Sequence, residues 1–228
     1  MVNNPFSGAR AALFDLDGTL IRTHIDFPAM KFRIADLVEQ FISLPDNLLE
    51  YDIMGLVYQV ETRLLTMGKG PLAKEFREEA FALLEEIEKQ QCATPEEFPG
   101  ATDLLKELHK RDVKVGVVTR NCRVVASQLL TAGNLRTDTL VCRDDVNHVK
   151  PDPEQIHFAL KAMGFPLDLP ADQIVVIGDH PMDIEAGKAA GARTIGVLHG
   201  QPTSIFDESK PDLIVPVIGD LVSLVKAL

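Results

Sequence analysis

The segment AALFDLDGT, residues 11–19, sets both the architecture and the chemistry that we expect of this chain. Its apolar start is typical of a short buried strand. Asp15 and Asp17 follow that strand, one residue apart. Side chains at positions i and i+2 of an extended chain share a face, so both carboxylates point the same way. Buried carboxylates are costly unless a partner offsets their charge, and Mg²⁺ is a cation that prefers oxygen ligands.

Composition limits the classes of protein to consider. The chain has 228 residues, a net charge of -11 and three cysteines without a C-x-x-C pair. Acidity argues against a general nucleic-acid or anionic-membrane binder, and the cysteines indicate neither a disulfide framework nor a zinc knuckle. The N-terminus lacks a signal-peptide pattern, and no apolar stretch approaches the roughly 18 residues of a membrane helix. We expect a cytoplasmic monomer or homodimer with no nucleic-acid or membrane partner.

Short apolar runs alternate with helical patterns in the C-terminal part of the chain. The runs that predict strands cover residues 11–14, 113–118, 139–142, 174–178 and 194–198, with a possible sixth at 212–215. Helical periodicity fills the intervals from residue 99 on. In one of these helices Asp152 is the N-cap candidate, Pro153 the first helical residue, and Gly164 lies just past the end. The alternation predicts an α/β fold with a doubly wound parallel sheet and helices on both faces.

Residues 22–98 have a different pattern. They contain no convincing strand and are typical of helices, with turns at Pro45 and at residues 67–71. Residues 71–92 form a long amphipathic pattern with Phe76, Ala80, Leu83, Leu84 and Ile87 on one stripe. Residues 94–100 resemble an exit linker. We therefore predict a core domain of residues 1–21 and 99–228, interrupted by an all-helical domain at 22–98.

Polar residues mark the ends of the predicted strands beyond the first. Thr119 ends one strand, and Asn121 is placed to cap the helix that follows, whose N-terminus offers free N–H groups to a phosphate. Lys150 precedes a proline, which favours an extended backbone, and its ammonium group is a natural point charge for phosphate.

A further acidic pair follows the strand at 174–178. Asp179 completes a carboxylate cluster if its strand neighbours the first, and Asp183 lies in the first turn of a helix that Pro181 opens. Ligands of open α/β sheets bind beyond the carboxyl ends of the strands, where all of these residues fall.

The motifs DLDGT, VVTRN, VKPDP and GDHPMD, in this order, resemble the haloacid dehalogenase superfamily over nearly the whole chain. They are most similar to its phosphatase-like branch with a helical cap, which includes phosphoglycolate phosphatase-like and β-phosphoglucomutase-like members. Residues 22–98 take the place of the cap. The resemblance implies a cap that closes over the site and excludes water from the attack step.

The resemblance also implies roles for individual residues. Asp15 would be the nucleophile that forms an aspartyl-phosphate, and Asp17 the general acid that then becomes the base activating water. Mg²⁺ would be held by Asp15, the backbone carbonyl of Asp17, and Asp179, with Asp183 in its outer shell. Thr119 and Lys150 would bind the phosphoryl oxygens. Arg120 lies outside the family pattern; we include it as a phosphate-binding candidate, with a solvent-facing side chain as the alternative.

These expectations predict a Mg²⁺-dependent phosphatase of a small soluble phosphate ester, with phosphoglycolate-like acids and sugar phosphates as the two classes to test. A phosphomutase would use the same two aspartates and stays as the alternative. A receiver-type signalling domain would need no large cap. Asp17 argues against a dehalogenase or a phosphonate-cleaving enzyme, because neither is expected to carry a second aspartate.

Two residues depart from the family pattern. Arg120 is bulky where other members have small residues, and His180 stands where a serine or threonine is common; we expect His180 to be an N-cap. Candidates for substrate selection are Arg22, His24, Lys31 and Lys69.

Overall fold

The computed structural model describes residues 4–44, 50–92, 94–166 and 169–228. The turn expected at Pro45 lies outside these residues. The chain divides into two compact units, one of residues 1–23 and 94–228 and the other of residues 24–93. No helix among the described residues is long and apolar enough to cross a membrane.

The first unit is built on a six-stranded parallel sheet with the order β5-β4-β1-β6-β7-β8. The chain therefore builds outward from β1 on one side and then returns to its other side, as the predicted doubly wound fold requires. The predicted runs match the observed strands closely, including the sixth. The strands are β1 Ala11–Phe14, β4 Lys114–Val118, β5 Thr139–Val141, β6 Ile174–Gly178, β7 Arg193–Val197 and β8 Leu213–Val215.

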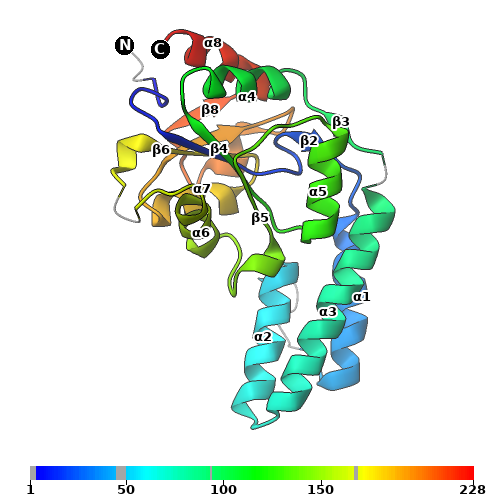
Figure 1. Cartoon of the computed structure of the whole chain (residues 1–228). Coiled ribbons are helices and arrows are strands. Elements are labelled where there is room, and N and C mark those ends of the chain that lie inside the picture. The colour runs from blue at the N-terminus through cyan, green and yellow to red at the C-terminus, as the bar shows by residue number, and fades with distance from the viewer. Residues whose placement is uncertain (1–3, 45–49, 93, 167–168) are drawn as a thin grey trace. The chain divides into compact units, whose positions relative to one another are not determined.

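Helices cover both faces of this sheet (Figure 1). On one face α4 packs on β4 and α8; on the other, α6 packs on β1, β4 and β5, and α7 on β6 and β7. All residues of β1 and β6 are buried, which explains why their sequences are continuously apolar. The helices are α4 Ala101–His109, α5 Arg123–Ala132, α6 Glu154–Ala162, α7 Pro181–Ala189 and α8 Leu221–Lys226; short 3-10 turns cover Arg143–Asp145, Ala171–Gln173, Thr203–Phe206 and Ile218–Asp220.

Two predicted helix caps were wrong by one residue. Helix α6 has Pro153 at its N-cap, and Asp152 lies just before it with Oδ1 accepting from Glu154 N at 2.9 Å. Helix α5 is capped at Cys122, because the side chain of Asn121 turns instead towards Asp17. Gly164 does lie just past the end of α6, with φ of 82°.

A small antiparallel ribbon corrects the prediction that residues 22–98 lack strands. Strand β2, Ile21–Arg22, pairs with strand β3, Glu96–Glu97. Strand β3 lies within residues 94–100, which the sequence predicts as an exit linker. Each strand has only two residues, and glutamate is a poor strand former, so no sequence signal marks them. The ribbon forms because the chain leaves the first unit and returns to it along neighbouring paths.

The described residues of the second unit form three α-helices, α1 Phe27–Phe41, α2 Ile53–Thr66 and α3 Gly70–Gln91, which pack on one another. Asp26 and Asp52 cap α1 and α2 by accepting from backbone N–H groups. The predicted stripe of α3 is confirmed at Phe76, Ala80, Leu84 and Ile87, which are buried, whereas Leu83 is half-buried. The predicted turn before α3 is also present, with Gly68 at φ of 72°.

Candidate active site

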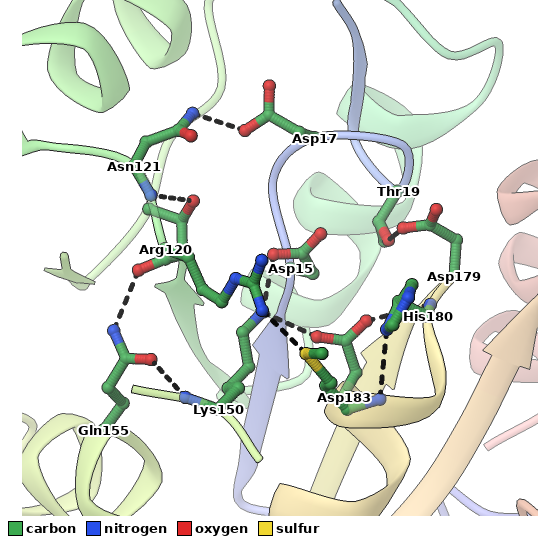
Figure 2. A network of polar contacts seen from close by, with 12 residues as sticks. Asp15, Asp17, Thr19, Arg120, Asn121, Lys150, Gln155, Asp179, His180 and Asp183 are labelled. Carbon is green, nitrogen blue, oxygen red and sulfur yellow. Dashed lines mark hydrogen bonds and ion pairs between the residues drawn. The ribbon is translucent and has the colours of Figure 1, made fainter. Parts of the chain in front are cut away.

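The carboxyl ends of β1, β4 and β6 bring the predicted residues together (Figure 2). Strand β1 pairs with β4 on one side and β6 on the other, and Phe14 is in register with both Val117 and Ile177. Backbone hydrogen bonds continue past the assigned strand ends, from Asp15 N to Ile177 O and from Thr119 N to Val141 O, both at 2.9 Å. Asp15 and Thr119 therefore take fixed directions at the edge of the sheet.

Lys150 is a buried cation held between two carboxylates. Its Nζ donates to Asp15 Oδ1 and to Asp183 Oδ1, each at 2.6 Å, and its side chain is only 4% exposed. Burial acts to lower the pKa of Lys150, but Asp15 and Asp183 outweigh burial, and the pKa rises above its ordinary value. Lys150 therefore stays charged at neutral pH.

The carboxylates carry more negative charge than Lys150 offsets. Burial raises the pKa of Asp15 from 3.8 to about 6, although Lys150 acts to lower it, and repulsion from Asp183 adds to the rise. Burial also raises the pKa of Asp179 well above its ordinary value, with repulsion from Asp15 as the next cause. A second positive charge at this place would favour the ionised form of both groups.

Three carboxylates have the geometry of a cation site. Oxygen atoms of Asp15, Asp179 and Asp183 lie within 4.8 Å of one another. Asp183 uses both oxygens within the protein, because Oδ1 accepts from Lys150 and Oδ2 accepts from His180 N at 3.0 Å. Asp15 Oδ1 accepts from Lys150, and Asp179 Oδ1 accepts from the Thr19 hydroxyl at 2.7 Å. An all-oxygen set of this kind suits Mg²⁺.

Two glycines make room for these carboxylates. A Cβ at Gly18 would lie 2.3 Å from Asp179 Oδ2, and a Cβ at Gly178 would lie 2.2 Å from Asp183 Oδ2. Gly18 also has φ of 84°, which side-chain-bearing residues rarely adopt. The group that approaches Gly18 closely is the Asp179 carboxylate.

Asp17 lies apart from the three clustered carboxylates, as Figure 2 shows. Its Oδ2 accepts from Asn121 Nδ2, and its Oδ1 accepts from the Thr23 hydroxyl at 2.7 Å. The side chain of Asp17 is thus directed by residues from two other segments. The expectation that Asp17 approaches a metal through its backbone carbonyl stays a prediction.

Thr119 and Arg120 lie on the loop after β4. Thr119 is buried, and its Oγ1 accepts from Asn121 N at 3.1 Å. The Arg120 carbonyl accepts from Arg143 Nη1 at 2.8 Å, and the Arg120 Nη1 lies 2.7 Å from Met182 Sδ in the first turn of α7. Contact of these two residues with a substrate phosphate remains a prediction.

His180 is the N-cap of α7, as expected. Its Nδ1 accepts from Met182 N at 3.3 Å, while its backbone N–H donates to Asp183 Oδ2. This capping box fixes the carboxylate of Asp183 at the point where it meets Lys150.

The candidates for substrate selection are dispersed. Arg22 belongs to the β2–β3 ribbon, where it pairs with Glu96 at 3.7 Å and lies 4.9 Å from the Phe98 ring centre. Lys31 Nζ donates to Tyr51 O within the helical unit. His24 and Lys69 are exposed.

Sequence reasoning missed the polar residues that support the site. Thr19 donates to Asp179, 160 residues further along the chain, whereas Thr23 donates to Asp17, which is only six residues away. Gln155 is completely buried and contacts the loops of Thr119 and Lys150. A buried glutamine inside an amphipathic helical pattern was the available signal.

A parallel sheet in this strand order, with acids and a lysine gathered at the carboxyl ends of its central strands, defines an α/β enzyme that handles a charged ligand. Residues 12–197 match the family model of haloacid dehalogenase-like hydrolases. The chain therefore belongs to this family, as the motifs indicate.

Relatives match over most of both chains. The chain is 33% identical to the N-acetylmuramic acid 6-phosphate phosphatase of Pseudomonas putida, over 89% of this chain and 87% of the relative. It is 28% identical to the phosphoglycolate phosphatase of Escherichia coli K12, over 96% and 93% respectively. A haloacid dehalogenase-like hydrolase structure from Bacteroides fragilis shares the fold, with a TM-score of 0.66 and 21% identity over 93% and 99%. Within this hydrolase family the chain is a phosphoric monoester hydrolase.

Proposed function

We propose that this protein is a Mg²⁺-dependent phosphatase that hydrolyses a small phosphomonoester through an aspartyl-phosphate on Asp15. The observation that carries the proposal is the buried Lys150, which binds Asp15 and Asp183 at 2.6 Å beside a third carboxylate, Asp179. An attacking carboxylate next to fixed positive charge is what transfer of an anionic phosphoryl group requires.

Two aspartates divide the chemistry. An oxygen of Asp15 attacks phosphorus, forming the new bond to phosphorus while the bond to the ester oxygen breaks. Asp17 gives its proton to the departing ester oxygen, so the alcohol leaves neutral. Asp17, now ionised, takes a proton from water; the resulting hydroxide attacks phosphorus and releases phosphate and Asp15. The contacts of Asp17 with Asn121 and Thr23 orient its carboxylate for this work.

The acidic cluster fits a magnesium ion. Asp15 and Asp179 would bind it directly, together with the backbone carbonyl of Asp17, and Asp183 would act from the outer shell. The raised pKa values of Asp15 and Asp179 support this assignment, because they indicate that the ionised site lacks positive charge. Bound Mg²⁺ would supply charge that stabilises the phosphoryl oxygens during transfer.

The phosphate subsite would be formed by Thr119, Arg120 and Lys150. Lys150 offers a buried positive charge, and Thr119 offers a hydroxyl at the start of the loop after β4. Arg120 would add a second cation, since its Nη1 lies 2.7 Å from Met182 Sδ in the same turn of α7 that carries Asp183.

We assign the helical unit the role of the cap, within the sequence-based bounds 22–98, and expect it to supply residues that select the substrate. The candidates within these bounds are Arg22, His24, Lys31 and Lys69. The curated relatives act on N-acetylmuramic acid 6-phosphate and phosphoglycolate, so phosphorylated acids and sugar phosphates are the first classes to test.

The test is phosphate release from a panel of both classes, with and without Mg²⁺, for the wild type and for Asp15→Asn. We expect the wild type to release phosphate only when Mg²⁺ is present and Asp15→Asn to release none. The control variant Asp207→Asn, changed at an exposed position, should release phosphate like the wild type. Activity in EDTA, or full activity of Asp15→Asn, would contradict the proposal. Isomerisation that needs a bisphosphate primer, in place of phosphate release, would identify a phosphomutase.

A further inference from the structure

Gln155 is a completely buried amide on α6 that forms hydrogen bonds in two directions. Its Nε2 donates to the backbone carbonyl of Thr119 at 2.8 Å, and its Oε1 accepts from the backbone N–H of Lys150 at 3.0 Å. Figure 2 shows both bonds, with the amide between the two loops. Gln155 therefore links the two segments that carry the proposed phosphate-binding residues.

The two bonds fix the orientation of the amide. A flipped side chain would put its oxygen against the Thr119 carbonyl and its NH₂ group against the Lys150 N–H. Both mismatched contacts would be buried, where an unsatisfied polar group is costly. Gln155 thus accepts only one arrangement of these loops, whereas its buried neighbours Ile156 and Ala159 provide apolar packing alone.

The bond to Thr119 also sets the direction of the following peptide. The C=O and N–H groups of a trans peptide lie in one plane and point in opposite directions, so a fixed Thr119 carbonyl makes the Arg120 N–H point away from Gln155. At the other end, the bond to Lys150 N holds the backbone from which the Lys150 ammonium reaches Asp15.

We infer that Gln155 is a positioning residue, which sets the spacing of the Thr119 and Lys150 sides of the phosphate subsite. The inference rests on the proposed function. Gln155 itself touches no reacting atom; it acts through the backbone of two residues that bind the phosphoryl group.

Gln155→Met tests the inference, because methionine has a similar length and removes both hydrogen bonds. Inorganic phosphate is the probe, used as a competitive inhibitor of p-nitrophenyl phosphate hydrolysis by the full chain. We expect the inhibition constant of phosphate and the KM to rise about tenfold. The thermal shift that Mg²⁺ produces should stay as in the wild type, because the clustered carboxylates keep their contacts. Ile156→Val, a buried change one residue along, should leave the phosphate constant unchanged.

Gln155→Leu, which also removes both hydrogen bonds, serves if the methionine variant fails to fold. It offers neither a donor for the Thr119 carbonyl nor an acceptor for Lys150 N, so phosphate binding should again weaken. Wild-type phosphate inhibition in either folded variant would overturn the inference. Loss of the Mg²⁺ shift together with phosphate binding would also overturn it, since that pattern indicates general damage. A wild type without phosphatase activity would refute the proposed function instead.

Discussion

Asp179 lies directly against Gly18, so closely that a Cβ at position 18 would come 2.3 Å from Asp179 Oδ2. Thr19, the next residue, donates to the other oxygen of the same carboxylate. The loop that carries Asp17 thus holds Asp179 from two sides. This arrangement makes the glycine of the first motif a determinant of where the carboxylate of the fourth motif stands.

Gly18→Ala should lower kcat/KM about a hundredfold, because displacement of Asp179 by even 1 Å misplaces a proposed metal ligand. Gly164→Ala is a matched control. Gly164 has φ of 82° against 84° for Gly18, but no atom lies within 4 Å of its built Cβ. Both variants should lose about 1 kcal/mol of stability from the backbone strain, and only Gly18→Ala should lose activity. Equal activities in the two variants, measured with p-nitrophenyl phosphate, would contradict the role of the Asp179 contact.

Asn121→Ala should lower kcat by about tenfold to a hundredfold while changing KM little, because Asp17 loses the donor that orients its carboxylate. The loss should be largest for alkyl phosphates, whose leaving groups need a proton, and smaller for p-nitrophenyl phosphate. Thr23→Val, which removes the second donor, should act in the same direction. Exposed Asn147→Ala provides the control. A uniform loss across both kinds of leaving group would point to a general disturbance of the site.

These predictions depend on contacts that the sequence left open. The six sheet strands were predictable because a parallel sheet buried on both faces requires continuous apolar runs, as in residues 174–178. The sequence placed Asp179 beside Asp15 only on the condition that their strands are neighbours, and the pairing of β1 with β6 meets that condition. The contacts of Asn121 with Asp17 and of Gln155 with Thr119 were not predictable, because each joins two segments that only tertiary packing brings near. The β2–β3 ribbon was missed for the same reason.

Mg²⁺ affinity should fall as the pH drops below about 6. In the folded protein burial raises the pKa of Asp15 to about 6, so at lower pH a proton must leave before a cation can bind. The affinity should then weaken by about tenfold per pH unit for one competing proton, and more steeply if Asp179 also releases one. Calorimetry at several pH values, in buffers of different ionisation enthalpy, measures both the affinity and the protons released. An affinity that is constant between pH 5 and pH 7.5 would contradict the assignment.

Asp138 should stabilise the edge of the sheet at neutral pH but not in acid. Its carboxylate accepts from Val115 N at 2.8 Å, Lys114 Nζ at 3.0 Å and His109 Nε2 at 3.1 Å, and so fastens the start of β5 to β4 and α4. Burial acts to raise the pKa of Asp138, but these donors outweigh burial and lower it below 3.8. Because the folded pKa lies below the unfolded one, the stabilisation is complete above the unfolded pKa and disappears as the pH falls through the folded pKa.

Asp138→Asn should therefore lower the free energy of unfolding by about 1 kcal/mol at pH 7, because an amide is a weaker acceptor for three donors. The difference from the wild type should shrink as the pH falls below about 4, the ordinary pKa of aspartate, and phosphatase activity at pH 7 should not change. Urea unfolding at pH 7 and pH 3 measures both differences, with the exposed Asp172→Asn as the control. A loss of the same size at both pH values would show that the stabilisation does not depend on the charge of Asp138.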